Sequence, residues 1–288
     1  MIELSQIITC EEEQMAGLSV LMSLYIKEKP GYVEECFQSL LRQTVKADEW
    51  VVVEDGPLTD ELYAVLEKYE KEYPGLIKRV PLKENRGLGL ALQAGVPECS
   101  NDLIARMDTD DIAREDRFEK QLEEFKKDPD LDITGSHIDE FEDTPDTIVA
   151  KRTVPLTDEA IKKYQKRRDG FNHMTVMYKK KAVLDAGNYQ SCPLMEDTYL
   201  WVRMMKNGVK CSNVDDSLVF ARIGKAMFDR RGGWAYFKKY RTGRKMVYAT
   251  GYISWSDYAV SIMVQFIVAL VPGRLRGWIF KKMLHGKK

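Results

Sequence analysis

A short apolar segment of the sequence leads into three closely spaced aspartates, Asp108, Asp110 and Asp111. Carboxylates at the end of a strand form a hard, oxygen-only site, which favours Mg²⁺ or Mn²⁺ and, through the cation, a diphosphate. One aspartate could instead cap the helix expected from about Glu115, since aspartate is a preferred N-cap residue. Capping needs only one aspartate, however, and three together repel one another unless a cation lies between them. We therefore expect a metal site that binds a nucleotide-activated substrate.

A second acidic pair, Glu196 and Asp197, precedes an amphipathic segment with helical spacing. Asp197 could simply be the N-cap or a first-turn acid of that helix. A carboxylate placed opposite a metal site can also act as a general base that removes a proton from an attacking hydroxyl. Separate acidic sites for a metal and for a proton suit a displacement at a carbon that carries a diphosphate leaving group.

Alternating strands and helices are expected to position these residues. Buried strands are predicted at 18–24, 49–54, 77–82 and 103–107, and helices at 32–42, 59–72 and 88–95. This alternation predicts a doubly wound sheet, in which ligands lie at the carboxyl ends of the strands. Further strands are predicted at 133–140, 175–178 and 218–221, and further helices at 197–207, 236–249 and 256–271.

Composition limits the class of protein. A chain of 288 residues can form one large α/β domain with an appendage. Its five scattered cysteines lack a CxxC spacing, which argues against zinc and disulfides and fits a reducing cytoplasm. The N-terminus has no basic segment typical of a signal peptide, and the apolar stretch Tyr258–Val271 is too short to span a bilayer. In the Gly87-Leu88-Gly89 segment the third glycine of a dinucleotide fingerprint is replaced by Leu92, so we expect no such site.

The C-terminal region differs from the rest of the chain in charge. Residues 222–288 contain 15 Lys or Arg and 2 Asp or Glu, although the whole chain has a net charge of −1. This asymmetry predicts contact with an anionic partner, either nucleic acid or a membrane surface. We expect reversible docking on the inner leaflet, the alternative being a helical lid packed on the catalytic domain. The side chains expected at the membrane are Trp255, Tyr258, Phe266, Trp278 and Phe280, beside Arg274, Arg276, Lys281 and Lys282.

The set of motifs resembles a known family. The motifs are Tyr25 after the first strand, Glu54-Asp55-Gly56, Asn85-Arg86-Gly87, Met107-Asp108-Thr109-Asp110-Asp111 and Glu196-Asp197-Thr198-Tyr199-Leu200-Trp201. Together they are similar to the family 2 glycosyltransferases with the GT-A fold, especially bacterial enzymes of capsule, O-antigen or exopolysaccharide synthesis. The resemblance covers roughly residues 18–235. It implies an α/β fold with a Rossmann-like, mostly parallel sheet and flanking helices. The change to aromatic and basic residues after Gly224 predicts a helical, basic C-terminal appendage to this fold.

The resemblance also implies a division of the chain. Residues 1–225 would form the catalytic domain, with a nucleotide-binding half at about 15–112 and an acceptor half at about 113–225. Residues 226–288 would be the membrane-associating region.

The resemblance assigns a role to each motif. Asp55 would contact the nucleotide base with Tyr25 beside it, and Arg86 would help to bind the nucleotide. Asp110 would be the direct metal ligand, and Asp108 would be shared between the metal and the ribose. The remaining assignments are Asp197 as catalytic base, Arg230 and Arg231 as the basic segment over the diphosphate, and Glu196 and His173 on the acceptor or metal side.

These roles imply an inverting, Mn²⁺- or Mg²⁺-dependent transfer of a sugar from a UDP-linked donor to a glycan or lipid-linked acceptor. We expect a cytoplasmic enzyme that is peripheral on the inner face of the cell membrane and does not bind nucleic acid. A nucleotidyltransferase is the first alternative, but the loop at 25–31 lacks the Gly-rich, basic composition typical of that class. A non-enzymatic nucleic-acid binder is the second, but it gives the acidic residues no role.

Overall fold

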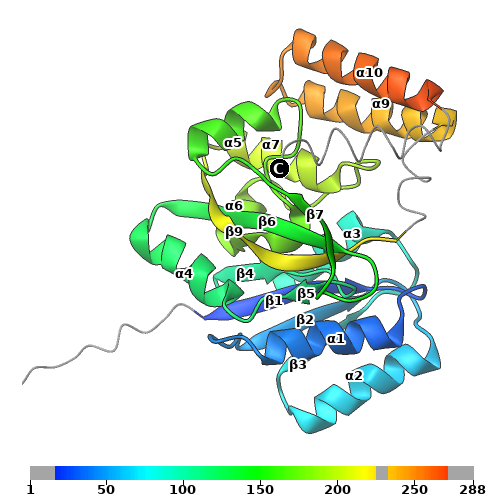
Figure 1. Ribbon diagram of the computed structural model, residues 1–288, viewed down its shortest axis with the longest axis vertical. Coiled ribbons are helices and arrows are strands. Elements are labelled where there is room, and N and C mark those ends of the chain that lie inside the picture. Colours follow the sequence, from blue (N-terminus) through cyan, green and yellow to red (C-terminus); the bar gives the residue numbers. More distant parts are fainter. Residues whose placement is uncertain (1–16, 225–232, 272–288) are drawn as a thin grey trace, which may run out of the picture.

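The computed structural model describes residues 17–224 and 233–271, and a single sheet lies at its centre (Figure 1). The strands are β1 Leu18–Leu24, β2 Glu49–Glu54, β3 Ile77–Pro81, β4 Leu103–Arg106, β5 Ile112–Ala113, β6 Leu131–Phe141, β7 Ile148–Arg152, β8 Met177–Lys179 and β9 Lys210–Arg222. Their order in the sheet is β3-β2-β1-β4-β8-β6-β9-β5, with β7 paired to the outer part of β6.

The first four strands form the predicted parallel unit. β1 pairs in parallel with both β2 and β4, and β2 pairs in parallel with β3. The carboxyl ends of β1, β2 and β4 therefore meet at one edge of the sheet. The later strands pair differently, because β8 runs antiparallel to β4 and to β6, while β6 and β9 are parallel. The sheet as a whole is thus mixed, and its parallel part is the half that carries the acidic motifs.

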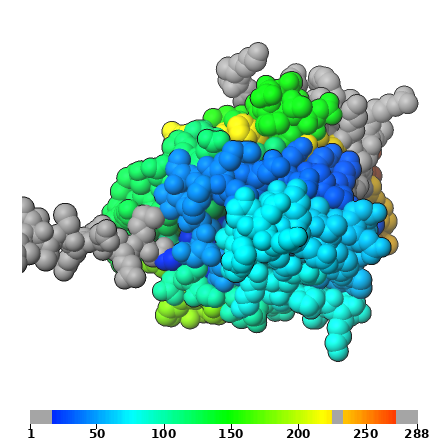
Figure 2. Space-filling view, turned by 90° about the horizontal axis from the view of Figure 1, so that it is seen from below, coloured from blue at the N-terminus to red at the C-terminus, as the bar shows by residue number. Residues whose placement is uncertain are grey.

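Helices cover both faces of the sheet. The helices are α1 Pro30–Leu41, α2 Asp60–Glu72, α3 Leu88–Glu98, α4 Arg117–Lys127, α5 Asp158–Gln165, α6 Lys180–Asp185, α7 Glu196–Lys206, α9 Gly233–Ala249 and α10 Trp255–Leu270, with a 3₁₀ turn at His173–Thr175. Residues of β1 alternate between the faces: Val20 packs with α1, α2 and α4, whereas Leu21 packs with α3, α6 and α7. Continuous apolar strands are expected when a parallel sheet is buried on both sides. In Figure 2, blue and cyan atoms of the N-terminal elements cover the end of the molecule that carries α1 and α2.

Most predicted elements are present, with two kinds of difference. The strand expected at 218–221 is the end of a longer strand, β9, which begins at Lys210. The short elements β5, β7, α5 and α6 were not predicted, because segments of two to eight residues show too little periodicity to identify.

The C-terminal helices α9 and α10 form a pair beyond α7, at the end of the molecule opposite α1 and α2 (Figure 1). The helix pair is held on the rest of the molecule by hydrogen bonds as well as by apolar contacts. Arg167 Nε donates to Asp257 Oδ1 at 2.7 Å, and the Tyr252 hydroxyl donates to the Lys162 carbonyl at 2.8 Å. None of the described helices combines the length and the apolar character needed to cross a membrane.

Candidate active site

Three carboxylates gather at the carboxyl end of β4. Met107 donates its amide to the Leu21 carbonyl at 3.1 Å, so the chain leaves the sheet beside β1 and then turns. One oxygen atom from each of Asp108, Asp110 and Asp111 can be chosen so that all three lie within 4.8 Å of one another. Oxygens bound to one Mg²⁺ or Mn²⁺ lie roughly 3–4 Å apart, so small side-chain rotations would bring this cluster onto a divalent cation. The residues present therefore fit the predicted metal.

The pKa values of the clustered carboxylates also favour a bound cation. Burial and then the charge of Asp108 raise the pKa of Asp110 to about 7. Burial and then Asp110 raise the pKa of Asp111 well above its usual value, although Asp111 Oδ1 accepts the Arg222 amide at 2.8 Å. The raised pKa values mean that these carboxylates have too little positive charge around them to neutralise their ionised forms. A divalent cation would supply that charge and restore their ionised form.

Arg106 is the counter-charge already present in the cluster. Its buried guanidinium donates from both terminal nitrogens to the Asp108 carboxylate, with Nη1 and Oδ2 2.7 Å apart. Arg117, also buried, donates to the Arg106 carbonyl at 2.7 Å and so fixes the backbone at this point. Asp108 is therefore held by a bidentate ion pair, whereas Asp110 has no positively charged partner among the described residues. Asp110 as the more direct ligand stays a prediction.

Glu28 is a further acidic residue that the sequence did not single out. It lies in the loop after β1, where burial raises its pKa and Asp108 raises it further. The charge of Glu28 in turn raises the pKa of Asp110. The sequence does carry one signal for Glu28. It lies four residues beyond the end of β1, at the edge of the sheet where β4 also ends.

Asp55 connects two loops at the same edge. Its carboxylate is 2% exposed and follows β2. Oδ1 accepts the Arg86 amide at 2.7 Å, and Oδ2 accepts the Gly87 amide at 3.0 Å and the Asn85 side-chain amide at 2.9 Å. The motif at 85–87 is thus held against the end of β2, and the exposed Arg86 side chain starts from a fixed backbone. Tyr25, 39% exposed, stands at the end of the adjacent strand β1.

Asp197 lies in the first turn of α7 and its side chain is 21% exposed. Burial, then the charges of Asp169 and Glu196, raise the pKa of Asp197 to about 8. Burial also raises the pKa of Glu196. A carboxyl whose pKa lies close to neutral pH is suited to proton transfer, because it can both lose and accept a proton under working conditions.

His173 lies against Asp197. Its Nε2 is 3.0 Å from the Tyr189 hydroxyl, and its Nδ1 is 4.0 Å from Asp197 Oδ2. Burial and then the charge of Arg106 lower the pKa of His173 well below its usual value, so the ring is neutral. The structure therefore places His173 beside the predicted base and not among the acidic metal cluster.

Arg106 links the two halves of the site. Its charge lowers the pKa values of His173 and Asp197 and also acts on Asp110. The predicted base and the predicted metal cluster therefore both lie within electrostatic range of one buried guanidinium. Sequence reasoning overlooked Arg106 because it occupies the last position of an otherwise apolar strand. The expected basic segment at Arg230 and Arg231 lies outside the described residues, as do Trp278, Phe280 and the basic residues beside them.

Comparisons with known proteins identify relatives of this chain. The family profile described as "Glycosyl transferase family 2" matches residues 19–186. The chain is 37% identical over 272 residues to the amylovoran biosynthesis glycosyltransferase AmsE of Erwinia amylovora, covering 93% of this chain and 99% of that protein. It is also 37% identical over 267 residues to the UDP-Gal:alpha-D-GlcNAc-diphosphoundecaprenol beta-1,3-galactosyltransferase of Escherichia coli, covering 93% and 96%.

A solved structure shows the same fold. The mannosyltransferase PcManGT from Pyrobaculum calidifontis, in complex with GDP-Man and Mn²⁺, superposes with a TM-score of 0.61 at 13% identity. The match covers 94% of this chain and 81% of that one.

Proposed function

The chain belongs to glycosyltransferase family 2 and is a glycosyltransferase of the GT-A fold, and we propose that it transfers a sugar, with inversion, from a UDP-linked donor to a lipid-linked acceptor in the synthesis of a bacterial surface polysaccharide. The observation that carries the proposal is an acidic cluster and the titratable carboxyl of Asp197, both within electrostatic range of Arg106. Similarity to an enzyme named for a diphosphoundecaprenol acceptor supports the lipid-linked substrate.

We assign donor binding to the edge formed by β1, β2 and the loop at 85–87. A carboxylate has about four acceptor sites, and three of those on Asp55 are used by residues 85–87. The remaining site, on Oδ1, can accept one N–H from a nucleotide base, as uracil would offer. Tyr25 would lie beside the base, and the cationic side chain of Arg86 would face the phosphates.

We assign the metal to Asp108, Asp110 and Asp111, with Mn²⁺ or Mg²⁺ as the ion. When bound, the cation neutralises the charge that develops on the leaving diphosphate. Arg106 holds Asp108 in place from the protein side, and the backbone amide of Arg222 holds Asp111. These contacts limit the rotation of two of the three carboxylates before a donor arrives.

We assign proton removal to Asp197. As the acceptor hydroxyl attacks the anomeric carbon, a new C–O bond forms, the bond to the diphosphate breaks, and the hydroxyl proton passes to the Asp197 carboxylate. Attack from the face opposite the diphosphate inverts the anomeric configuration. The neutral His173 and the adjacent Glu196 border this side of the site, where they would contact the acceptor.

A donor panel tests the assignment. The full chain would be incubated with UDP-glucose, UDP-galactose, UDP-N-acetylglucosamine or GDP-mannose, each with Mn²⁺ and polyprenyl-diphosphate-linked N-acetylglucosamine. We expect acceptor-dependent release of UDP and a product in which the anomeric configuration is inverted. Release of GDP alone, or a product that retains the configuration, would contradict the proposal. The Asp110→Asn variant is the control for metal-dependent release.

We further propose that α9 and α10 dock on the inner leaflet of the cell membrane. Large apolar side chains of α10 are exposed, and so are basic residues of α9, the helix that packs against it. They are Trp255, Met263, Val264, Ile267 and Leu270 on α10, and Lys238 and Lys239 on α9. Such a surface combines the apolar burial and the attraction to anionic lipids that interfacial helices use.

Vesicle flotation tests this docking. We expect the full chain to float with vesicles of phosphatidylglycerol and phosphatidylethanolamine and to float less with phosphatidylcholine. The double substitution Ile267→Asp and Leu270→Asp should leave the chain in the aqueous fraction. Val149→Asp changes an exposed apolar residue on β7, outside the helix pair, and serves as the control. Unchanged flotation of the double variant would refute the docking surface.

A further inference from the structure

The α9–α10 pair is held firmly on the side of the molecule that carries Asp197. A Cβ atom on Gly243 would lie 2.4 Å from the Pro193 carbonyl, so α9 touches the chain just before α7. Val247 packs in one apolar cluster with Met195 and with Val202 of α7. The two helices are therefore a fixed wall beside the predicted base.

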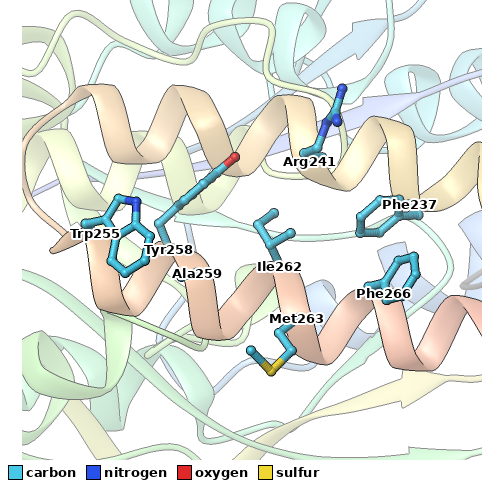
Figure 3. A pocket seen from close by; sticks show the side chains of 8 residues that line it. All are labelled: Phe237, Arg241, Trp255, Tyr258, Ala259, Ile262, Met263 and Phe266. Carbon is cyan, nitrogen blue, oxygen red and sulfur yellow. The ribbon is translucent and has the colours of Figure 1, made fainter.

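A groove of about 500 Å³ lies between the two helices (Figure 3). Its lining residues are Phe237 and Arg241 from α9, and Trp255, Tyr258, Ala259, Ile262, Met263 and Phe266 from α10. The rings of Phe237 and Phe266 meet edge to face at 5.6 Å and form one end. The groove is largely open to solvent and its walls are mostly apolar, and its volume falls within the roughly 300–1,000 Å³ of pockets that bind small molecules.

Arg241 is the one charged residue among the eight that line the groove. Its side chain is exposed, and no described carboxylate forms an ion pair with it. The groove thus combines an apolar trough with an uncompensated cation at its rim. That combination suits a ligand with a hydrocarbon chain and an anionic head.

We propose that this groove binds the polyprenyl chain of a polyprenyl diphosphate, with the diphosphate at Arg241. The inference rests on the proposed function, because it identifies where the lipid of the lipid-linked acceptor lies. Arg241 is a residue of α9, which packs on α7, and Asp197 lies in the first turn of α7. A head group at Arg241 would therefore stand on the same side of the molecule as the base.

The test is calorimetric titration of the full chain with farnesyl diphosphate, in EDTA and without a donor nucleotide. EDTA keeps the acidic cluster from binding the probe through a metal. Inorganic diphosphate and farnesol provide the head and the chain separately. We expect farnesyl diphosphate to bind at least tenfold more tightly than either fragment, since the apolar and the charge-assisted contacts are then made together.

Two substitutions locate the probe. Ala259→Trp fills the groove and should weaken binding of farnesyl diphosphate by about tenfold or more, whereas Ala249→Trp adds the same ring at an exposed position outside the groove and should not. Arg241→Glu should weaken binding of farnesyl diphosphate by about tenfold and leave farnesol binding unchanged. Lys245→Glu makes a similar charge change elsewhere on α9 and is its control.

Several results would overturn the proposal. Equal affinity of Ala259→Trp and the unsubstituted chain for farnesyl diphosphate would show that the probe binds elsewhere. Self-association that Ala259→Trp abolishes would make the groove a contact between two copies of the chain. Because the titration contains neither donor nor sugar acceptor, its failure leaves the transfer reaction untouched. Conversely, a chain that binds the probe but transfers no sugar would contradict the proposed function and not the groove.

Discussion

The pH dependence of the reaction gives the sharpest test of Asp197. With a pKa of about 8, set by burial and by the charges of Asp169 and Glu196, this carboxyl is about 1% ionised at pH 6, about 10% at pH 7 and half ionised at pH 8. Only the ionised form can take the acceptor proton, so kcat/KM should rise about 50-fold from pH 6 to pH 8 and then level off. An aspartate of ordinary pKa, about 4, would give a flat profile over this range.

The assay is release of UDP at donor and acceptor concentrations below KM, between pH 5.5 and 9 at constant ionic strength. Asp197→Asn should lower kcat/KM at pH 8 by about 10²–10⁴-fold, the usual contribution of a general base. Asp169→Asn removes the second-largest cause of the raised pKa of Asp197. The rise of kcat/KM with pH should therefore occur at lower pH in this variant. Asp146→Asn makes the same change at an exposed site and should leave the pH of this rise unchanged.

A profile that stays flat between pH 6 and pH 8 would refute the reasoning. The reasoning would also be refuted if kcat/KM of Asp197→Asn rose with pH in the same way as in the unsubstituted chain. In that case the titrating group would belong to the acidic cluster, where burial and Asp108 give Asp110 a pKa of about 7. Purified variants should retain the circular dichroism of the unsubstituted chain, so that a loss of rate is not a loss of fold.

Three further predictions concern the cluster and its supports. Asp110→Asn should weaken Mn²⁺ binding at least 10–100-fold, measured by calorimetry, because the cluster loses a charged donor; unchanged affinity would remove this residue from the ligand set. Arg106→Met leaves a carboxylate without its buried partner and should lower the free energy of unfolding in urea by about 3 kcal/mol; an unaltered midpoint would mean that the ion pair contributes nothing. Gly89→Ala places a Cβ 2.8 Å from the Glu196 Cβ and should cost about 1–3 kcal/mol by thermal unfolding, whereas Gly31→Ala, which meets no atom within 4 Å, should be neutral.

The parallel half of the fold was predictable because its signals are local. The bounds of β1 and β2 agree with the predicted 18–24 and 49–54, since each is a continuous apolar run between polar turns. The helix at 59–72 was predicted with its first residue one position early, where Thr59 caps α2 through its side chain. Each of these features depends on residues that are neighbours in the chain.

The rest depends on contacts that sequence spacing does not encode. The antiparallel pairing of β8 with β4 brings together residues about 75 positions apart. The raised pKa of Asp111 requires full burial, and its carboxylate accepts the amide of Arg222, which lies 111 positions away. In the sequence, Arg106 is one polar residue at the end of an apolar strand. Only the folded chain shows that its charge acts on both the predicted metal cluster and the predicted base.

The close approach of α3 and α7 at Gly89 and Glu196 has a consequence for the chemistry. Aligned peptide dipoles place roughly half a positive elementary charge at the first turn of each helix. At the start of α3 the Asp55 carboxylate accepts the Gly87 amide and offsets this charge, whereas the N-cap residue of α7, Met195, makes no side-chain cap hydrogen bond. Asp197 lies in the first turn of α7, so the field of α7 favours its anion and opposes the burial that favours its protonated form. The proton affinity of this carboxyl is therefore a balance of two opposed influences, which an arriving acceptor can shift by displacing water.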